Sequence, residues 1–514
     1  MTNVLPCVTY SAQAVSKQQP NATLRISFAR LVRRMNNLTY LFTAIWFFGC
    51  SKPAGPTLAI THATLIDATG APPQPDMTIL IDDHRITAVG GFPSISIPRN
   101  AQVIDATGKF LIPALFDSHV HLTGAGEPEG SREFFLPLLL ANGIATVRDM
   151  GGYLESLVPL RRDIREGKRL GPEIFFAGPY LDGSPPSFQP SMAVVNAVEA
   201  SEDVRTLTQQ RVDFIKVQSI LSRDAYFAIA AAARREHIAF VGHVPDRVTA
   251  AEASDAGQKS IEHLTGVLRA CSSDELRLMR EQFQAAPSNA TAESSHAREM
   301  TWERELLRTY SDKQAGTLIA KFVHNQTCQV PTLILLRNDA YPAAETDSPA
   351  DPLLRFVPRA IAEKWKQVRL TQDRLMNEDD FDLREKLFAQ SMRVVAQMQS
   401  SGVSILAGTD TAAPYVIPGF ALHQELALLV KAGLSPMQAL QAATKNPADF
   451  LGKGKTQGTI EPGKTADLLL LDANPLEDIS NTQKIRALIV RGNVLDRAAL
   501  DGLLSSARKF AIAN

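Results

Sequence analysis

Cysteine is scarce in this chain, and its few cysteines lack the spacing of a structural metal site. The 514 residues include four cysteines, Cys7, Cys50, Cys271 and Cys328, with no CxxC pair and no Cys/His finger. A thiolate zinc site of the usual spacing is therefore excluded. Cys271 and Cys328 lie in the body of the chain, where an exported protein would permit one disulfide between them. Two unrelated free thiols are the alternative.

An excess of charge of one sign is also missing. Lysine and arginine total 53, aspartate and glutamate total 54, and the net charge is -1. A nucleic-acid surface needs a basic excess or stripe, so we expect no nucleic-acid partner. No internal repeat or low-complexity tract stands out. With 45% hydrophobic and 21% charged residues, the chain has ordinary globular composition, sufficient for one large domain and a smaller one.

The N-terminal region has no apolar run long enough to cross a membrane. Its apolar stretch 38–49 follows three arginines and has the length of a signal-peptide core. It ends at Gly49-Cys50-Ser51, which resembles a bacterial lipoprotein signal with Cys50 as the lipidated first residue. We expect export, to the periplasm or to a lipid anchor in the membrane of a bacterium. The alternative is a cytoplasmic protein with a disordered leader and a chance apolar run.

Two β-rich pieces, one at each end of the remaining chain, frame a middle of different character. "LAITHATLIDATG", "DMTILIDDHRITAVG" and "AQVIDATGKFLIPAL" at the front, and "TADLLLLDANP" and "IRALIVRGNVLD" at the back, indicate short strands bounded by turn residues. The middle alternates β-branched apolar runs with helix-like segments such as 223–236, which is typical of βα units around a parallel sheet.

Eight strand-length runs can be counted in this middle region. The first ends near Asp117, and the others are 144–151, 173–179, 214–218, 238–244, 259–264, 329–335 and 403–410. Eight such units in about 300 residues predict an α/β fold of the (β/α)8 barrel type. The connections after the sixth and seventh strands are long and contain helix-like pieces. Within them, the charged stretch 288–299 is expected to be a mobile lid or an excursion.

Ionisable residues occur at the carboxyl ends of five of these strands, where barrel enzymes keep their chemistry. They include four of the ten histidines of the chain; the set is His119, His121, Lys216, His243, His263 and Asp410. Strand alternation sends the two histidines of "FDSHVHL" to one face, so both can reach one divalent ion. Neutral imidazoles and a carboxylate are good zinc ligands.

Lys216 suits such a site only in a modified form. A lysine that has captured carbon dioxide becomes an anionic carbamate, which has two oxygens to bridge a pair of ions. Each member of the set also has a structural alternative when taken alone. His243 and His263 could be buried core histidines, Lys216 an edge residue, and Asp410 a helix cap. The ordered conjunction at strand ends favours a metal site.

The same segments resemble the amidohydrolase superfamily, in its imidazolonepropionase-like and prolidase-like branch. The matching pieces span roughly residues 55–495 and include "LIPALFDSHVHL", "TVRDMGG", "FIKV", "VGHVP", "SIEHL", "AGTDT" and "GTIEPGKTADLLLLDANP". The resemblance implies a barrel over 113–454 and a small β-sandwich built from 55–112 and 455–514, after a leader and linker at 1–54. It also implies that the six residues hold two divalent ions, zinc being the expected metal, with carboxylated Lys216 as the bridging ligand.

The reaction implied by the resemblance is hydrolysis of an amide-type C–N bond in a small molecule, such as a dipeptide or an N-acyl amino acid. A metal-bridging hydroxide would attack, with Asp410 as general base and then proton donor to the leaving nitrogen. Three further residues are candidates for substrate contact: Arg148 for a carboxylate, Tyr180 and His423. Arg148 could instead pair with a structural acid, and His423 could instead be a helix-surface or capping residue.

Two alternatives remain open at this point. A mononuclear deaminase or cyclic-amide hydrolase is one, although several such deaminases carry a glutamate just after the fifth-strand histidine, where this chain has "GHVPDR". A non-catalytic surface lipoprotein with a decayed site is the other, and the complete ligand set argues against it. Metal content separates the three. The sequence does not indicate an oligomeric state.

Overall fold

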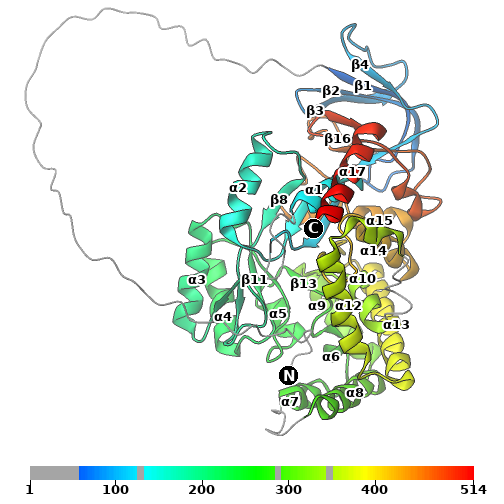
Figure 1. Ribbon diagram of the computed structural model, residues 1–514. Helices are drawn as coiled ribbons and strands as arrows, with labels where there is room; N and C mark the ends of the chain where they lie inside the picture. Colours follow the sequence, from blue (N-terminus) through cyan, green and yellow to red (C-terminus); the bar gives the residue numbers. More distant parts are fainter. Residues whose placement is uncertain (1–56, 124–131, 284–290, 343–350) are drawn as a thin grey trace, which may run out of the picture.

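The computed structural model describes residues 57–123, 132–283, 291–342 and 351–514. The leader, including Cys50 and the predicted signal sequence, lies outside the described residues. Within the described ranges, no helix combines the length and the apolar character needed to cross a membrane. The chain forms an α/β body and, at one end of it, a sheet built from both flanks (Figure 1).

The strands of the two flanks form one eight-stranded sheet. Its order is β17-β16-β15-β5-β1-β2-β3, with β4 pairing with β1. The antiparallel pair of β5 with β15 joins the front of the chain to its back, with Phe110 opposite Leu471. The strand bounds are β1 Leu58–Leu65, β2 Gln74–Asp82, β3 Arg85–Gly91, β4 Gln102–Asp105, β5 Phe110–Pro113, β15 Leu468–Leu471, β16 Ile485–Val490 and β17 Asn493–Asp496.

Strand β15 lies between two hydrophobic cores. Leu468 and Leu470 belong to the core of the flank sheet. Leu469 and Leu471 point the other way, into the core of the α/β body. Because successive side chains of a strand face opposite sides, both faces of "LLLL" are buried and the strand shows no polar alternation.

The α/β body contains parallel strands in two described sheets. One has the order β6-β7-β8, and the other has the order β10-β9-β11-β12-β13-β14. Residues 403–411 lie between them, with parallel bridges from Ile405 to Gln329 and from Thr411 to Val120. The bounds are β6 Leu115–Val120, β7 Ile144–Asp149, β8 Glu173–Phe176, β9 Tyr180–Asp182, β10 Ser191–Ala193, β11 Ile215–Val217, β12 Phe240–Gly242, β13 Ser260–Glu262 and β14 Cys328–Val330.

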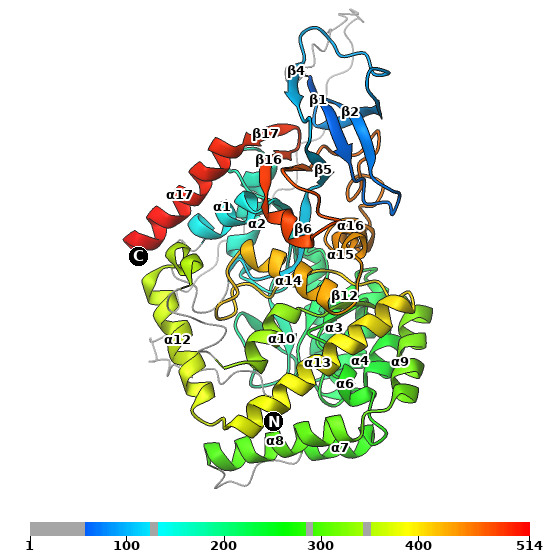
Figure 2. The same ribbon diagram turned by 90° about the vertical axis from the view of Figure 1, so that its right-hand side faces the viewer.

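Helices alternate with these strands and also build a separate wall (Figure 2). The first group is α1 Arg132–Ala141, α2 Leu154–Arg165, α3 Ala197–Gln209, α4 Arg223–Arg235, α5 Ala250–Asp255, α6 Val267–Ala270, α9 Asp312–Asn325, α10 Leu333–Ala340 and α14 Phe420–Lys431. The wall contains α7 Glu275–Phe283, α8 Ala292–Arg308, α12 Arg359–Asp373 and α13 Glu378–Ser400. The last helices are α15 Pro436–Ala442, α16 Lys445–Phe450 and α17 Arg497–Ala513.

The predicted helix at 223–236 is confirmed, since α4 covers all of it except the capping residue Glu236 and begins after the side-chain cap of Ser222. Three other predictions need correction. The stretch 403–410 is not a regular strand, because it makes only an isolated bridge at Ile405. The stretch 329–335 is not a strand throughout, because α10 begins at Leu333. The stretch 288–299 is helical from Ala292, where the Thr291 and Ser294 side chains form a capping box. The capping residues look loop-like in the sequence because they are the same polar types that favour turns.

The cysteines of the body settle one of the alternatives. Cys271 is buried and Cys328 is partly buried, and both are free thiols. Cys271 and Cys328 are therefore two separate thiols in this structure and form no disulfide with each other.

Candidate metal centre and its cavity

Strand β6 and segment 403–411 bring three predicted ligands together. The backbone N–H of Asp410 donates to the carbonyl of His119 at 2.8 Å, which places the aspartate beside the HxH pair. Asp410 Oδ1 lies 3.2 Å from His119 Nε2 and 3.0 Å from His121 Nε2. One ligand atom from each of the three residues falls within 4.8 Å of the other two. This spacing suits a single divalent cation.

Each of the four histidines is oriented by a hydrogen bond at Nδ1. His119 Nδ1 donates to the Glu262 carboxylate at 2.9 Å. His121 Nδ1 donates to the Gly151 carbonyl at 3.1 Å. A neutral imidazole that donates from Nδ1 presents a lone pair at Nε2, which is the form a metal requires. The remaining two bonds join His243 to Ser219 Oγ at 2.7 Å and His263 to Thr332 Oγ1 at 2.7 Å.

The charge pattern at the first group also fits a cation. His119 Nε2 is buried and makes no hydrogen bond within the described part of the protein. It faces the carboxylate oxygen Asp410 Oδ1 at 3.2 Å. The lone pairs of a neutral imidazole and of a carboxylate therefore point at the same place, where a cation would bind both. Burial by itself would raise the pKa of Asp410, but the neighbouring rings of His263 and His119 hold it well below its ordinary value. The donor set of two imidazoles and one carboxylate matches zinc chemistry.

The other three predicted ligands lie beside this group. The His263 ring centre is 4.5 Å from that of His119 and 5.1 Å from that of His243. Lys216 is 1% exposed on β11, directly opposite Val241 of β12. Burial lowers the pKa of Lys216 to about 8, against the opposing effect of Glu262 and Asp410. A neutral amine is therefore accessible near neutral pH.

Gly242 leaves the space that the Lys216 side chain occupies. A Cβ at Gly242 would lie 2.9 Å from Lys216 Cδ and 2.3 Å from the Val217 carbonyl oxygen. The φ angle of Gly242 is also +128°, which side-chain-bearing residues rarely adopt. The "VGHV" sequence therefore needs glycine before the histidine.

Two of the predicted ligands have a strained backbone. The φ angles of His263 and Asp410 are +57° and +62°. Non-glycine residues are uncommon in this left-handed region, and such residues concentrate at functional sites where packing enforces them. Thr332, the partner of His263, has a φ of +46° as well.

Arg148 lies among buried strand residues and does not line the cavity. Its Nη2 donates to both Glu262 carboxylate oxygens at 2.8 Å, and its Nε donates to the Ser118 carbonyl at 2.6 Å. Burial alone would raise the pKa of Glu262, but Arg148 and His119 hold it well below its ordinary value. Glu262 thus stays ionised and orients His119. Arg148 therefore pairs with a buried structural acid, which is the alternative to substrate binding that the sequence left open.

The two other predicted substrate residues, Tyr180 and His423, lie in different places. Tyr180 lines the cavity, with its hydroxyl 3.1 Å from His121 Nδ1. His423 is 1% exposed and outside the cavity lining, and its Nδ1 bonds to Thr482 Oγ1 at 2.9 Å. His423 therefore ties α14 to the C-terminal flank, and it is neither on the helix surface nor at the cavity.

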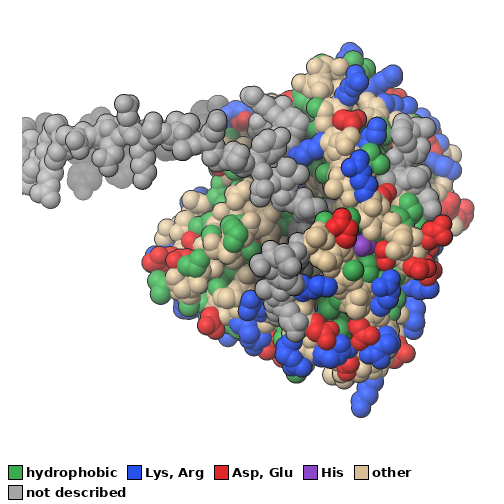
Figure 3. Space-filling view, turned by 60° about the horizontal axis from the view of Figure 1, so that its bottom comes forward, with side chains coloured by type: hydrophobic (Ala, Val, Ile, Leu, Met, Phe, Trp, Pro, Cys, Tyr) green, Lys and Arg blue, Asp and Glu red, His purple; other side chains and the backbone are tan. Residues whose placement is uncertain are grey.

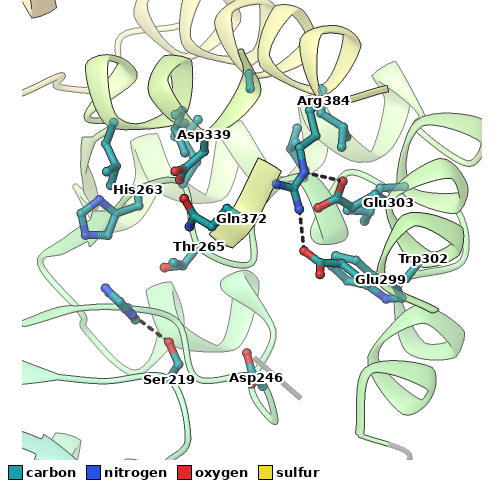
Figure 4. Close-up of a pocket in the computed structure, with 18 of the residues that line it drawn as sticks. Ser219, Asp246, His263, Thr265, Glu299, Trp302, Glu303, Asp339, Gln372 and Arg384 are labelled. Atoms are coloured by element: carbon teal, nitrogen blue, oxygen red, sulfur yellow. Dashed lines mark hydrogen bonds and ion pairs between the residues drawn. The ribbon is translucent and has the colours of Figure 1, made fainter. Parts of the chain in front are cut away.

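The six predicted ligands open onto a cavity of about 1520 Å³. Its opposite wall comes from α7, α8, α12 and α13, with apolar side chains that include Trp302, Leu306, Phe381 and Phe388. In that wall Arg384 binds Glu299 at 2.8 Å and Glu303 at 3.4 Å, across the cavity from His263 and Ser219 (Figure 4). On the outer face seen in Figure 3, basic and acidic side chains are interspersed.

Sequence reasoning missed the groups that orient the ligands. Glu262 was visible as an acid inside the apolar strand "KSIEHL", and a buried carboxylate requires a partner. Ser219 and Thr332 gave no such signal, because serine and threonine after a strand are common turn residues.

Comparison with known proteins agrees with this site. The amidohydrolase family profile matches residues 110–495, so the chain belongs to the amidohydrolase family. Members of this family are generally metal-dependent hydrolases. The chain is 38% identical to ochratoxinase of Aspergillus niger over 90 residues, or 17% of this chain. That match spans 18% of the ochratoxinase length, so the activity of the whole relative is not transferred by it.

Solved structures resemble the chain over a greater length. A proposed prolidase from Bifidobacterium longum has 26% identity and a TM-score of 0.63, covering 88% of this chain and 100% of that one. Bottromycin amidohydrolase has 22% identity and a TM-score of 0.69, covering 88% and 90%. The second likeness concerns the fold alone. Together with the parallel strands described above, they support a TIM-barrel-like α/β fold.

Proposed function

We propose that this protein is a binuclear metal-dependent amidohydrolase that cleaves the amide of a dipeptide, an N-acyl amino acid or a related carboxylated amide. The observation that carries the proposal is the convergence of the Nε2 atoms of His119 and His121 with Asp410 Oδ1 at the floor of one cavity. His243, His263 and Lys216 beside them supply a second set of donors. The bridging of β14 and β6 by residues 403–411 supports closure into a (β/α)8 barrel, and the joint flank sheet supports a β-sandwich.

The chain's own residues divide the chemistry between them. When bound, divalent ions polarise the amide carbonyl and make water acidic. Asp410 takes the proton from the attacking water, since its depressed pKa keeps it ionised at neutral pH. It then gives that proton to the leaving nitrogen. Glu262 and Gly151 hold the rings of His119 and His121 in place throughout.

Lys216 is proposed to act as a carbamate. The amine nitrogen attacks the carbon of carbon dioxide, an N–C bond forms as one C=O π bond opens, and one proton passes from the nitrogen to solvent, which leaves an anion with two oxygens. Burial with a lowered pKa near 8 supplies the neutral amine that this step requires. The carbamate would then serve as the bridging ligand of two zinc ions.

Cavity size narrows the proposed substrates. Ligand pockets commonly measure about 300–1,000 Å³, and this one is about 1520 Å³. Trp302, Leu306, Phe381 and Phe388 supply apolar contacts in a wall that also contains the charged Arg384, Glu299 and Glu303. Amides with a bulky aromatic or aliphatic group on one side therefore fit better than the smallest dipeptides. Export and lipidation at Cys50 remain predictions from the leader.

Metal content and a substrate screen test the proposal together. Purified zinc-loaded protein should hold two equivalents of metal per chain by mass spectrometry and hydrolyse members of a dipeptide and N-acyl amino acid library. One equivalent would instead favour the mononuclear deaminase type. Absence of metal would overturn both.

Replacing Asp410 with asparagine tests the proton transfer. Asp410→Asn should lower kcat by roughly 10²- to 10⁴-fold, the usual contribution of a general base. Asp339→Asn is the matched control, because it removes a carboxylate from the same cavity that is not a proposed ligand. Full activity of Asp410→Asn with its metal retained would refute the proposed role.

A further inference from the structure

Helices α7 and α8 supply one wall of the cavity, yet their side chains lie outside the hydrophobic core of the body. Among the described residues of the two helices, the buried apolar side chains are Leu278, Met300 and Leu306. None of the three belongs to a core cluster, although α6 and α9 on either side of the pair take part through Val267 and Leu318. Because few buried apolar contacts mean low local stability, this helix pair can separate from the body at little cost.

The two ends of the helix pair meet at a narrow neck. Ser272, before α7, and Thr309, after α8, are hydrogen-bonded through their hydroxyls at 2.6 Å. The Ser273 N–H donates to the Thr309 carbonyl at 2.8 Å, and the Ser311 N–H donates to the Cys271 carbonyl at 2.8 Å. A segment whose two ends are joined at one place can pivot there, since a few residues at the ends of elements absorb the change in backbone angles.

The two helices are also bound to each other and move as one unit. The Trp302 indole N–H of α8 donates to the Leu278 carbonyl of α7 at 3.0 Å. Arg277 of α7 forms an ion pair with Glu305 of α8 at 2.6 Å. These bonds lie within the pair, so separation of the pair from the body leaves them intact.

The contact between α8 and the body is made by charged side chains. Two residues of α13, Arg384 and Asp380, bind one face of α8 (Figure 4 shows the Arg384 part). The four pairs are Arg384–Glu299 at 2.8 Å, Arg384–Glu303 at 3.4 Å, Asp380–His296 at 3.0 Å and Asp380–Arg304 at 3.1 Å. Ion pairs that water can reach contribute little each and are replaced by hydration when they part, so this contact can break and re-form.

We propose that α7 and α8 form a hinged flap, which pivots at the neck 271–273 and 309–311 and opens at the contact between α8 and α13. The flap is closed in this structure, where Trp302 and Leu306 line the same cavity as the predicted ligands. Opening admits a bulky substrate and releases its products. Closure places the two apolar side chains against the bound substrate and excludes bulk water from the reaction.

Tryptophan gives a probe for this motion. The chain has three tryptophans, of which Trp302 lies in the flap and Trp365 lies in α12 as part of the core. The third, Trp46, belongs to the leader. Fluorine NMR of the full-length protein labelled with fluorotryptophan follows each of them, with Trp302→Phe to assign the flap signal. No metal, substrate or turnover is needed, so the measurement is independent of the proposed function.

Removal of the Arg384 cation should open the flap. Arg384→Met leaves Glu299 and Glu303 without their partner, and the ratio of open to closed states reported by Trp302 should rise by roughly tenfold or more, as expected for lost hydrogen bonds to charged groups. Lys386→Met is the matched control, because Lys386 lies on the same helix but forms an exposed pair within it. Its Trp302 signal should equal that of wild type.

The Trp365 signal separates flap opening from general loss of structure. It should stay unchanged in Arg384→Met while the Trp302 signal changes. An unchanged Trp302 signal, or equal changes at both tryptophans, would overturn the proposal. If Arg384→Met does not fold, Arg304→Met decides: it removes only the half-exposed pair with Asp380 and should raise the open-to-closed ratio roughly twofold. No change there overturns the flap, whereas failure to hydrolyse any amide counts only against the proposed function.

Discussion

At the scale of single residues, the centre is organised by buried charge. Glu262 is fully buried and accepts hydrogen bonds from Arg148, Ser260 and His119. A buried carboxylate is tolerable only with such partners, because the desolvation of an unpaired charge costs several kcal/mol. Arg148 thus stabilises the ionised Glu262, and Glu262 in turn holds His119 in the tautomer that exposes Nε2.

Arg148→Met is expected to destabilise the protein strongly, because it leaves Glu262 buried without its countercharge. The free energy of unfolding should fall by roughly 3–5 kcal/mol. Chemical denaturation measures this loss. Arg162→Met is the control, since Arg162 makes an exposed pair with Asp163 at 3.2 Å and should cost less than about 1 kcal/mol. Equal losses in the two variants would contradict the structural role of Arg148.

At the scale of elements, helix α10 follows strand β14, and the turn between them holds the residue that orients His263. It begins one residue after Thr332, the partner of His263. The N–H of Ile334 in its first turn donates to Glu425 of α14 at 2.8 Å. Burial raises the pKa of Glu425 to about 8, with the backbone N–H groups of Ile334 and Leu333 opposing the rise. Glu425 is therefore largely protonated at neutral pH.

This shift makes stability depend on pH. Between the ordinary pKa of 4.5 and the folded-state pKa of about 8, the folded protein keeps a proton that the unfolded chain has released. The unfolded state then binds fewer protons, so stability falls as pH rises, by up to about 1.4 kcal/mol per pH unit. Glu425→Gln keeps an acceptor oxygen for the Ile334 N–H but cannot ionise, so the fall in stability that Glu425 causes with rising pH should disappear.

The free energy of unfolding of Glu425→Gln relative to wild type should therefore increase between pH 5 and pH 7.5. Urea denaturation at both pH values measures it. Glu477→Gln, at an exposed carboxylate, should follow wild type at both. Parallel curves for wild type and Glu425→Gln would show that Glu425 is ionised in the folded protein.

At the scale of the whole molecule, the flank sheet and the α/β body share strand β15. Leu469 covers Gly143 just before β7, where an added Cβ would lie 2.7 Å from its side chain. Leu470, on the other face of the strand, packs in the flank core. One four-residue strand therefore contributes side chains to both hydrophobic cores. We expect the flank sheet and the α/β body to unfold together.

Leu470→Ala tests this coupling. Loss of a buried leucine side chain should cost about 2–5 kcal/mol. Trp302 and Trp365 lie in the α/β body, so the midpoint seen by tryptophan fluorescence should fall although the change is in the flank core. Leu170→Ala is the control, because Leu170 is 45% exposed. An unchanged fluorescence transition with an earlier, separate loss of β-sheet signal would mean that the flanks unfold independently.

The sequence by itself predicted six candidate ligands and the order of the elements that bring them together. His119, His121, Lys216, His243, His263 and Asp410 lie at the carboxyl ends of strand-length runs, and the expectation that parallel strand ends meet requires no long-range information. The pairing of the two β-rich flanks was likewise expected, through resemblance. Strand lengths were overestimated, because β-branched residues continue past the hydrogen-bonded part of strands such as β12.

Only the tertiary structure decided which buried groups are partners. Arg148 and Glu262 are 114 residues apart in the chain. The role of each depends on whether a partner lies within hydrogen-bond distance in space, which local patterns do not encode. Residue type and order thus determined the chemistry available to the protein, and packing determined which atoms are left to perform it.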